Sequence, residues 1–286
     1  SWNTLLYYEK ENDVLEKQNV VMQKFVKSAN LKFQTGETNA LEKTIASAKQ
    51  QELEQKIKQN KAQIAIEKSK LKVILDLKTD FIAIDTSFVP YPAMAKVDSS
   101  MVKQNPIVQL ANQQVQIAQA IHKVEKSALS PDFSVGYFLQ SITGNQDVNG
   151  TSTYYNNSPQ FQGFTVGIAV PLFAGSNIAK AKAAKTNIER EQKNADYINQ
   201  QFKSHLEQQS EQLTTYGSLI EYYKNTAMPN ANLIIKNATK GYQNGDISYV
   251  EYVQSIETAS QIQLNYSEAI YNYNQTIITI QYSINQ

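Results

Sequence analysis

The chain has 286 residues, with 27 Lys and Arg against 26 Asp and Glu and a formal net charge of +1. This balance gives no electrostatic reason to expect nucleic acid as a partner. The chain has no cysteine and two histidines, which excludes thiol chemistry and a histidine-rich metal site. Its mean hydropathy is −0.46, and no apolar run approaches the roughly 20 residues of a membrane-spanning helix. If the protein enters a membrane, strands must cross it.

Residues 1–76 predict a helical hairpin. Helix is expected from Ser1 to about Ser28, and the glycine-containing segment Phe33–Asn39 predicts a tight turn. Helix is expected again as far as Leu75. Apolar residues that recur in sevens indicate a seam that needs a partner helix. They are Ile57, Ile64 and Leu71.

Residues 77–98 predict a non-helical connection, because Pro90 and Pro92 lie within it. The pattern there is compatible with a short strand at Phe81–Ile84. Residues 99–129 return to helical spacing and predict a third helix that runs into Ser130.

Residues 130–175 change from helical spacing to strict alternation, which predicts two strands. Large side chains alternate with small or polar ones from Phe133 to Gln140 and again from Gly163 to Val170, and Pro171 is expected to end the second strand. The polar segment Ser141–Gln160 predicts a long loop. Such a pair suits a strand with lipid on one side and water on the other, or a hairpin on a soluble core.

Residues 176–286 predict a second, longer helical hairpin. The helix from about Ser176 should continue through Pro229 with a kink, and the break is expected at Gly241–Asp246. The last helix repeats apolar residues in sevens, which we interpret as packing rather than a binding platform. They are Tyr252, Ala259, Tyr266, Tyr273 and Ile280.

The two hairpins are copies of one pattern. A shift of 209 positions takes Gly36 to Gly245, Phe33 to Tyr242 and Glu42 to Glu251. Each copy is therefore expected to be helix, tight glycine turn and helix.

These features together resemble the outer-membrane efflux (TolC-like) family, and within it the heavy-metal efflux channels of the CusC kind. The resemblance rests on the two aromatic-x-x-Gly turns, on Ala128–Pro131 before the strands, and on the sequence Val170–Gly175 after them. The first strand pair of the family pattern is absent. We therefore expect the natural polypeptide to continue at its N-terminus by about 110 residues.

The resemblance implies a mainly α fold with a β-hairpin. Long antiparallel helical hairpins would form a periplasmic coiled-coil α-barrel, residues 77–98 an equatorial connection, and residues 99–129 a helix rising to the membrane. Residues 130–175 would add two strands to a trimeric transmembrane β-barrel in the outer membrane. The implied function is a passive exit duct for metal ions or small toxic compounds. The implied partners are two further copies, a periplasmic adaptor, an inner-membrane pump and outer-membrane lipid.

The resemblance also implies which residues act at each end of the duct. At the periplasmic entrance, adaptor docking and gating would involve Phe33, Gly36, Glu42, Tyr242, Gly245 and Glu251. On the strands, the residues expected to face lipid are Val135, Tyr137, Phe164, Val166 and Ile168. Both glutamates also complete capping boxes, with Asn39 and Ser248. The cap and a gating role are compatible.

No nucleophile–base constellation, phosphate-binding loop or metal-ligand spacing is found, so we expect no enzymatic activity, no cofactor and no bound metal. Two other functions fit the same sequence. The chain could be the outer-membrane duct of a type I protein secretion system, or a soluble coiled-coil scaffold or adaptor. Extraction would separate the last from the others, because a membrane duct requires detergent.

Overall fold

The structure is a computed structural model that describes residues 1–81, 87–92, 102–103 and 105–285. Its contacts divide the chain into two compact units. The first unit combines Ser1–Met101 with Lys203–Gln286, and the second is Val102–Phe202. The predicted class, mainly helical with a β-hairpin, is confirmed.

The first hairpin consists of α1 (Trp2–Gln34) and α2 (Ala40–Ile74). The first helix was expected to end near Ser28, but it continues to Gln34 because only Gly36 takes up the left-handed φ that ends it, at 76°. The predicted seam of α2 is buried at Ile57 and Leu71. Asn60 and Glu67 are buried on the same side of the helix, where the sequence gives no apolar signal.

The second hairpin begins with α4 (Gly175–Tyr222), continues through a π-helical segment, η2 (Tyr223–Ala227), into α5 (Met228–Asn244), and returns as α6 (Tyr249–Asn285). The helix continues through Pro229, as predicted. Pro229 has no N–H to donate to the preceding turn, and the wider π turn lies just before it. The break was expected from Gly241, but α5 is helical to Asn244, and only Gly245 is left-handed there.

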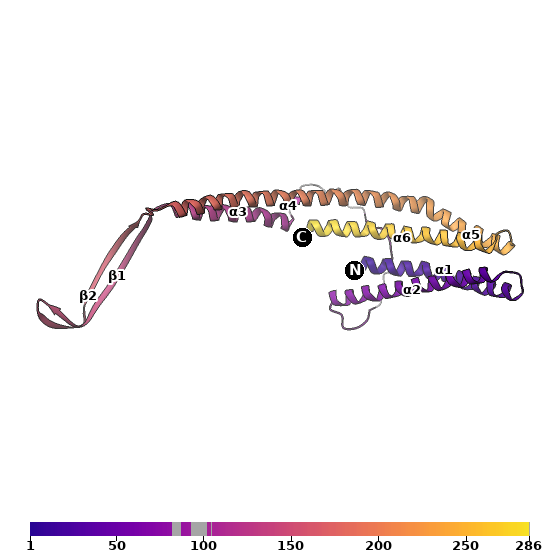
Figure 1. The fold of residues 1–286 in the computed structure, drawn as a ribbon, viewed down its shortest axis with the longest axis horizontal. Helices are drawn as coiled ribbons and strands as arrows, with labels where there is room; N and C mark the ends of the chain where they lie inside the picture. The colour runs from indigo at the N-terminus through magenta and orange to yellow at the C-terminus, as the bar shows by residue number, and fades with distance from the viewer. Residues whose placement is uncertain (82–86, 93–101, 104, 286) are drawn as a thin grey trace. The chain divides into compact units, whose positions relative to one another are not determined.

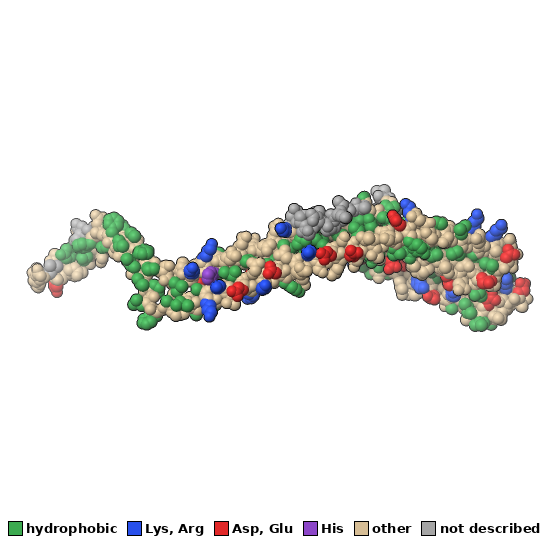
Figure 2. Space-filling view, turned by 90° about the horizontal axis from the view of Figure 1, so that it is seen from above, with side chains coloured by type: hydrophobic (Ala, Val, Ile, Leu, Met, Phe, Trp, Pro, Cys, Tyr) green, Lys and Arg blue, Asp and Glu red, His purple; other side chains and the backbone are tan. Residues whose placement is uncertain are grey.

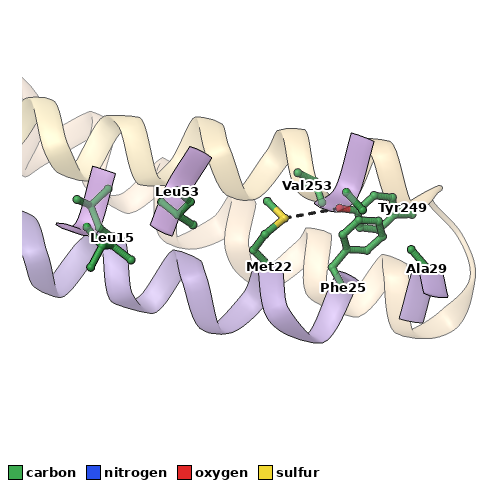
Figure 3. Packing of buried hydrophobic residues seen from close by; sticks show 9 residues of the cluster. Leu15, Met22, Phe25, Ala29, Leu53, Tyr249 and Val253 are labelled. Carbon is green, nitrogen blue, oxygen red and sulfur yellow. Dashed lines mark hydrogen bonds between the residues drawn. The ribbon is translucent and has the colours of Figure 1, made fainter. Parts of the chain in front are cut away.

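Helix α6 is the centre of the first unit, with α5 on one side and α1 on the other (Figure 1). Near the turns, apolar side chains of α1, α2 and α6 form one cluster (Figure 3). Its members include Leu15, Met22, Phe25, Leu53, Tyr249 and Val253. Burying one such aliphatic or aromatic side chain contributes about 1.5–3 kcal/mol, so this cluster fastens the first hairpin to the second.

A buried asparagine fixes the connection after α2 to the same central helix. Asn274 on α6 is 1% exposed. Its Nδ2 donates to the Val89 carbonyl at 2.9 Å, and its Oδ1 accepts from the Tyr91 N–H at 2.7 Å. Backbone N–H and carbonyl groups that are buried need hydrogen-bond partners. The Asn274 side chain supplies partners for the Tyr91 N–H and the Val89 carbonyl. The strand considered at Phe81–Ile84 lies mostly outside the described residues.

In the second unit, α3 (Pro106–Ser127) packs on the N-terminal half of α4. The contact is formed by Ala111, Val115 and Ala195. The helix was expected from Ser99, but residues 99–101 and 104 lie outside the part of the chain that the structure describes. It begins at Pro106 because Asn105 caps it, its Oδ1 accepting from the Ile107 N–H at 2.8 Å. Proline at the first helical position costs nothing, since that N–H has no partner within the helix.

The strand pair is longer than the sequence predicts. Strands β1 (Asp132–Val148) and β2 (Thr151–Ala169) are antiparallel and meet at the turn Asn149–Gly150. The predicted loop Ser141–Gln160 is therefore wrong. Both turn residues have positive φ, 52° and 81°, which is the geometry of a two-residue hairpin turn. A shift in register between Ser141 and Thr143 interrupts an otherwise continuous pairing.

Candidate functional site

The turn of the first hairpin ends α1 with two backbone hydrogen bonds. The Gly36 N–H donates to the Phe33 carbonyl at 3.2 Å, and the Glu37 N–H donates to the Lys32 carbonyl at 2.8 Å. This is the glycine-terminated helix end in which a left-handed residue turns the chain back on the last carbonyls.

The turn of the second hairpin repeats these bonds at the positions that the sequence shift predicts. The Gly245 N–H donates to the Tyr242 carbonyl at 3.2 Å, and the Asp246 N–H donates to the Gly241 carbonyl at 2.8 Å. Gly245 has φ of 79°. The two tips are therefore the same structure built twice.

The helix that follows each turn begins differently. At the second tip the capping box is complete, because the Ser248 N–H donates to Glu251 Oε2 at 2.7 Å and the Glu251 N–H donates to Ser248 Oγ at 3.3 Å. The hydrogen bonds from Ser248 hold the pKa of the Glu251 carboxyl below its usual value.

At the first tip the predicted capping box is only half formed. The Glu42 N–H donates to Asn39 Oδ1 at 2.9 Å. The Glu42 carboxylate, however, accepts from the Thr38 hydroxyl instead of the Asn39 N–H. Thr38 precedes the cap by one residue and supplies a nearer donor, and this competing hydroxyl has no counterpart at Ile247.

The aromatic residues of the two tips are in different surroundings. Tyr242 is half-buried, with its ring 4.8 Å from the Tyr252 ring in a stacked arrangement. Phe33 is exposed, and Lys43 Nζ lies 4.8 Å from its ring centroid. Of the two, Phe33 is therefore the one that presents an aromatic surface outward at its tip.

The five strand residues expected to face lipid are all solvent-exposed in the isolated chain, and they share one face. The register pairs Val135 with Val166, and Tyr137 with Phe164, and directly paired residues point to the same side of a sheet. The exposed fractions are 79% for Val135, 58% for Tyr137, 80% for Phe164, 78% for Val166 and 64% for Ile168. Phe133 and Leu139, which alternate in phase with them, are exposed on the same face.

On the other face of the strand pair, a glycine on one strand is paired with a larger residue on the neighbouring strand, as in Gly163 with Phe138 and Gly167 with Ser134. A Cβ added to Gly163 would lie 2.8 Å from the Phe138 ring, and one added to Gly167 would lie 2.7 Å from Ser134 Oγ. These glycines leave room for the side chain across the ladder. Figure 2 shows that hydrophobic side chains gather on the half of the strand pair next to the helices, while the turn end is mostly polar.

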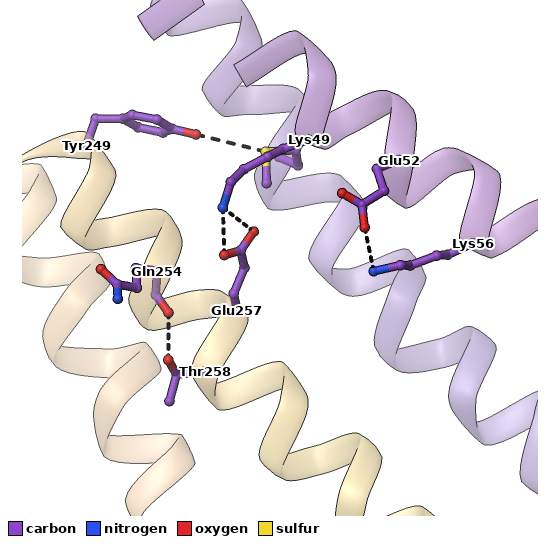
Figure 4. Close-up of polar contacts among 8 residues, drawn as sticks. Lys49, Glu52, Lys56, Tyr249, Gln254, Glu257 and Thr258 are labelled. Carbon is purple, nitrogen blue, oxygen red and sulfur yellow. Dashed lines mark hydrogen bonds and ion pairs between the residues drawn. The ribbon is translucent and has the colours of Figure 1, made fainter. Parts of the chain in front are cut away.

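A polar contact that the sequence did not predict joins the two hairpins. Lys49 Nζ on α2 lies 2.7 and 2.8 Å from the two carboxylate oxygens of Glu257 on α6 (Figure 4). A buried contact joins α6 to α1, where the Tyr249 hydroxyl donates to Met22 Sδ at 3.9 Å. Lys49 and Glu257 are 208 positions apart. No local pattern in a single sequence indicates that two such distant residues pair, so the contact becomes visible only in the folded structure.

In sequence, residues 99–286 match the family model described as outer membrane efflux protein. The chain belongs to this family. No curated protein matches the sequence. The family is one of channels of the outer membrane rather than of enzymes.

Solved structures of outer membrane channels share the fold of this efflux-family chain. VceC from Vibrio cholerae superposes with a TM-score of 0.80 at 12% identity, over 99% of this chain and 67% of that one. CmeC from Campylobacter jejuni gives 0.76 at 14%, over 99% and 60%. CusC gives 0.79 at 16%, over 99% and 66%. The chain thus spans about two thirds of the length of the channels that it resembles.

None of the described helices contains a stretch long and apolar enough to cross a membrane. Within the described part of the chain, no group of three or more His, Asp or Glu side chains is arranged to hold a metal ion.

Proposed function

We propose that this chain forms part of a homotrimeric outer-membrane duct, the passive exit of a tripartite efflux system for metal ions or small toxic compounds. The observation that carries the proposal is the strand pair. It presents a row of large apolar side chains, and no element of the chain covers them within the described residues. Two strands cannot satisfy their edges in lipid, so the pair must join others in a closed barrel.

The helices support assembly with further copies. Helix α3 packs one stripe against α4, yet it carries a second apolar stripe that is exposed. The second stripe consists of Ile107, Leu110, Ile117, Ile121 and Val124. A helix in a closed ring has a neighbour on each side and needs two apolar seams. Neighbouring copies of the chain would cover the second seam.

The hairpin tips support docking of a periplasmic adaptor that is coupled to an inner-membrane pump. Each tip is a tight turn closed by backbone hydrogen bonds, with an acidic residue in the first turn of the next helix, Glu42 or Glu251. In a trimer, six such tips would surround one entrance. The carboxylates would form rings that favour cations there.

Extraction and deletion test this proposal. The protein should require detergent for solubility and run as an oligomer that dissociates on heating. Deleting its gene should sensitise the cells to metals or dyes without loss of secreted proteins. A protein that is soluble in buffer would overturn the duct, and loss of secreted proteins alone would indicate a type I secretion duct instead.

A further inference from the structure

One carboxylate of the first unit, that of Glu11, has surroundings unlike those of the other glutamates on its helix. Glu11 on α1 is half-buried and lines a cavity of about 430 Å³ between α1, α2 and α6. Neighbouring glutamates on the same helix are ion-paired with α2, Glu9 with Lys68 and Glu16 with Lys61. Among the described residues, Glu11 has no such cationic partner.

The groups that face Glu11 come from all three helices. From α2, Asn60 Nδ2 donates to Glu11 Oε2 at 2.9 Å. From α6, Glu268 lines the same cavity and raises the pKa of Glu11 by its charge. The other charged or titratable groups of the cavity wall are Tyr7 and Tyr8 of α1 and Lys56 of α2. Lys56 is paired with Glu52 at 2.8 Å.

Asn60 is left half satisfied by this arrangement. Its side chain is buried, and its Oδ1 has no hydrogen-bond partner among the described residues. A buried acceptor without a donor is costly and calls for an explanation. A protonated carboxyl has an O–H to give, and an acid and an amide can pair through two hydrogen bonds at once. Protonation of Glu11 would therefore supply the donor that Asn60 lacks.

We propose that Glu11 and Asn60 form a proton-operated contact. When Glu11 takes up a proton, its bond to Asn60 tightens α1 on α2, and the loss of its charge lets the first hairpin pack more closely on α6 at Glu268. The proton adds the second bond to Asn60, and it removes the repulsion between Glu11 and Glu268 across the cavity. The contact does not depend on what the duct transports, although its use in closing or opening an entrance rests on the proposed function.

The direction of the pH effect follows from the surroundings of Glu11. Burial is the main cause that raises the pKa of this carboxyl above its ordinary value of 4.5, and the charge of Glu268 adds to it, while the bond from Asn60 opposes it. The folded state thus binds the proton more tightly than the unfolded chain. The stabilisation is complete below the ordinary value and is lost as the pH rises through the raised one.

Hydrogen exchange on the full chain, purified in detergent, tests the proposal without any transport assay. Protection of peptides from α1 and α6 near Glu11 and Glu268 is compared at about pH 7.5 and about pH 5.5, corrected for intrinsic exchange and referred to α3. We expect protection to rise roughly two- to tenfold on acidification.

Three variants make the result specific. Glu11→Gln keeps an acceptor for Asn60 and supplies a permanent donor, so protection should be high at both pH values. Asn60→Leu should reduce the rise. Glu16→Gln makes the same chemical change on the same helix outside the cavity and should leave the rise intact. A Glu11→Gln protein with the wild-type pH response, or a wild-type protein without one, would overturn the proposal. Because no efflux is measured, either outcome is separate from failure of the proposed function.

Discussion

Replacing Asn274 by alanine should unfasten the connection after α2 from the central helix. The side chain is 1% exposed and is bonded to the Val89 carbonyl and the Tyr91 N–H at 2.9 and 2.7 Å. Each hydrogen bond contributes about 1 kcal/mol net, and each buried group left without a partner costs about 1–3 kcal/mol. Part of this cost is relieved when the connection moves into water. We expect a loss of about 2–4 kcal/mol in the free energy of unfolding.

Two measurements check this expectation. Guanidinium unfolding followed by circular dichroism gives the change in midpoint, and hydrogen exchange of a peptide covering residues 87–92 reports the Tyr91 amide directly. Gln275→Ala is the matched control, because Gln275 is the next residue of α6 and is exposed; such a change usually lies within about 0.5 kcal/mol. If Asn274→Ala behaves like this control and the Tyr91 amide stays protected, the asparagine does not hold the connection.

Three further changes address the strands and the tips. Val166→Arg should cost about 2–4 kcal/mol if Val166 faces mid-membrane lipid, while Thr165→Arg should mainly alter conductance; equal tolerance would mean that the strand has no lipid face. Changing both Glu42 and Glu251 to Gln should lower cation preference and divalent block in single-channel recording, most clearly at low salt. Unchanged selectivity would leave both residues as helix caps alone. Gly245→Ala should cost about 1–2 kcal/mol in thermal or denaturant unfolding, because φ is 79° there.

Controls separate these effects from general damage. Gly175→Ala should be neutral or stabilising, since Gly175 begins α4 and has open space around its Cα. An unchanged oligomer on gels should accompany the double Gln variant. A loss in Gly175→Ala as large as that in Gly245→Ala would show that the left-handed turn is not the cause.

The hairpins were predictable because their signals are local. An apolar residue every seventh position requires a helical partner, and a glycine that alone accepts a left-handed φ marks where each helix ends. The repeat then predicted that Gly36 and Gly245 end equivalent helices, and the same backbone bonds occur at both turns.

The polar parts of the structure carried no such signal. The outer half of the strand pair has few apolar residues to alternate, so the sequence beyond Ser141 predicts a loop, although Asn149–Gly150 is a strong hairpin turn sequence. Asn60 and Asn274 are buried beside partners from distant parts of the chain, Glu11 for Asn60 and the backbone of Val89 and Tyr91 for Asn274. A single sequence does not encode these pairings in any local pattern.

The length of the strands has a consequence for the outside of the cell. A 17-residue strand such as β1 rises about 58 Å at roughly 3.4 Å per residue, whereas about 9–11 residues suffice to cross a bilayer. If the apolar half next to the helices lies in lipid, as the proposed function requires, the half around Asn149 and Gly150 projects beyond the headgroups as a stiff, nearly uncharged ribbon. Antibodies, proteases or bacteriophage that never enter the cell would meet this ribbon first.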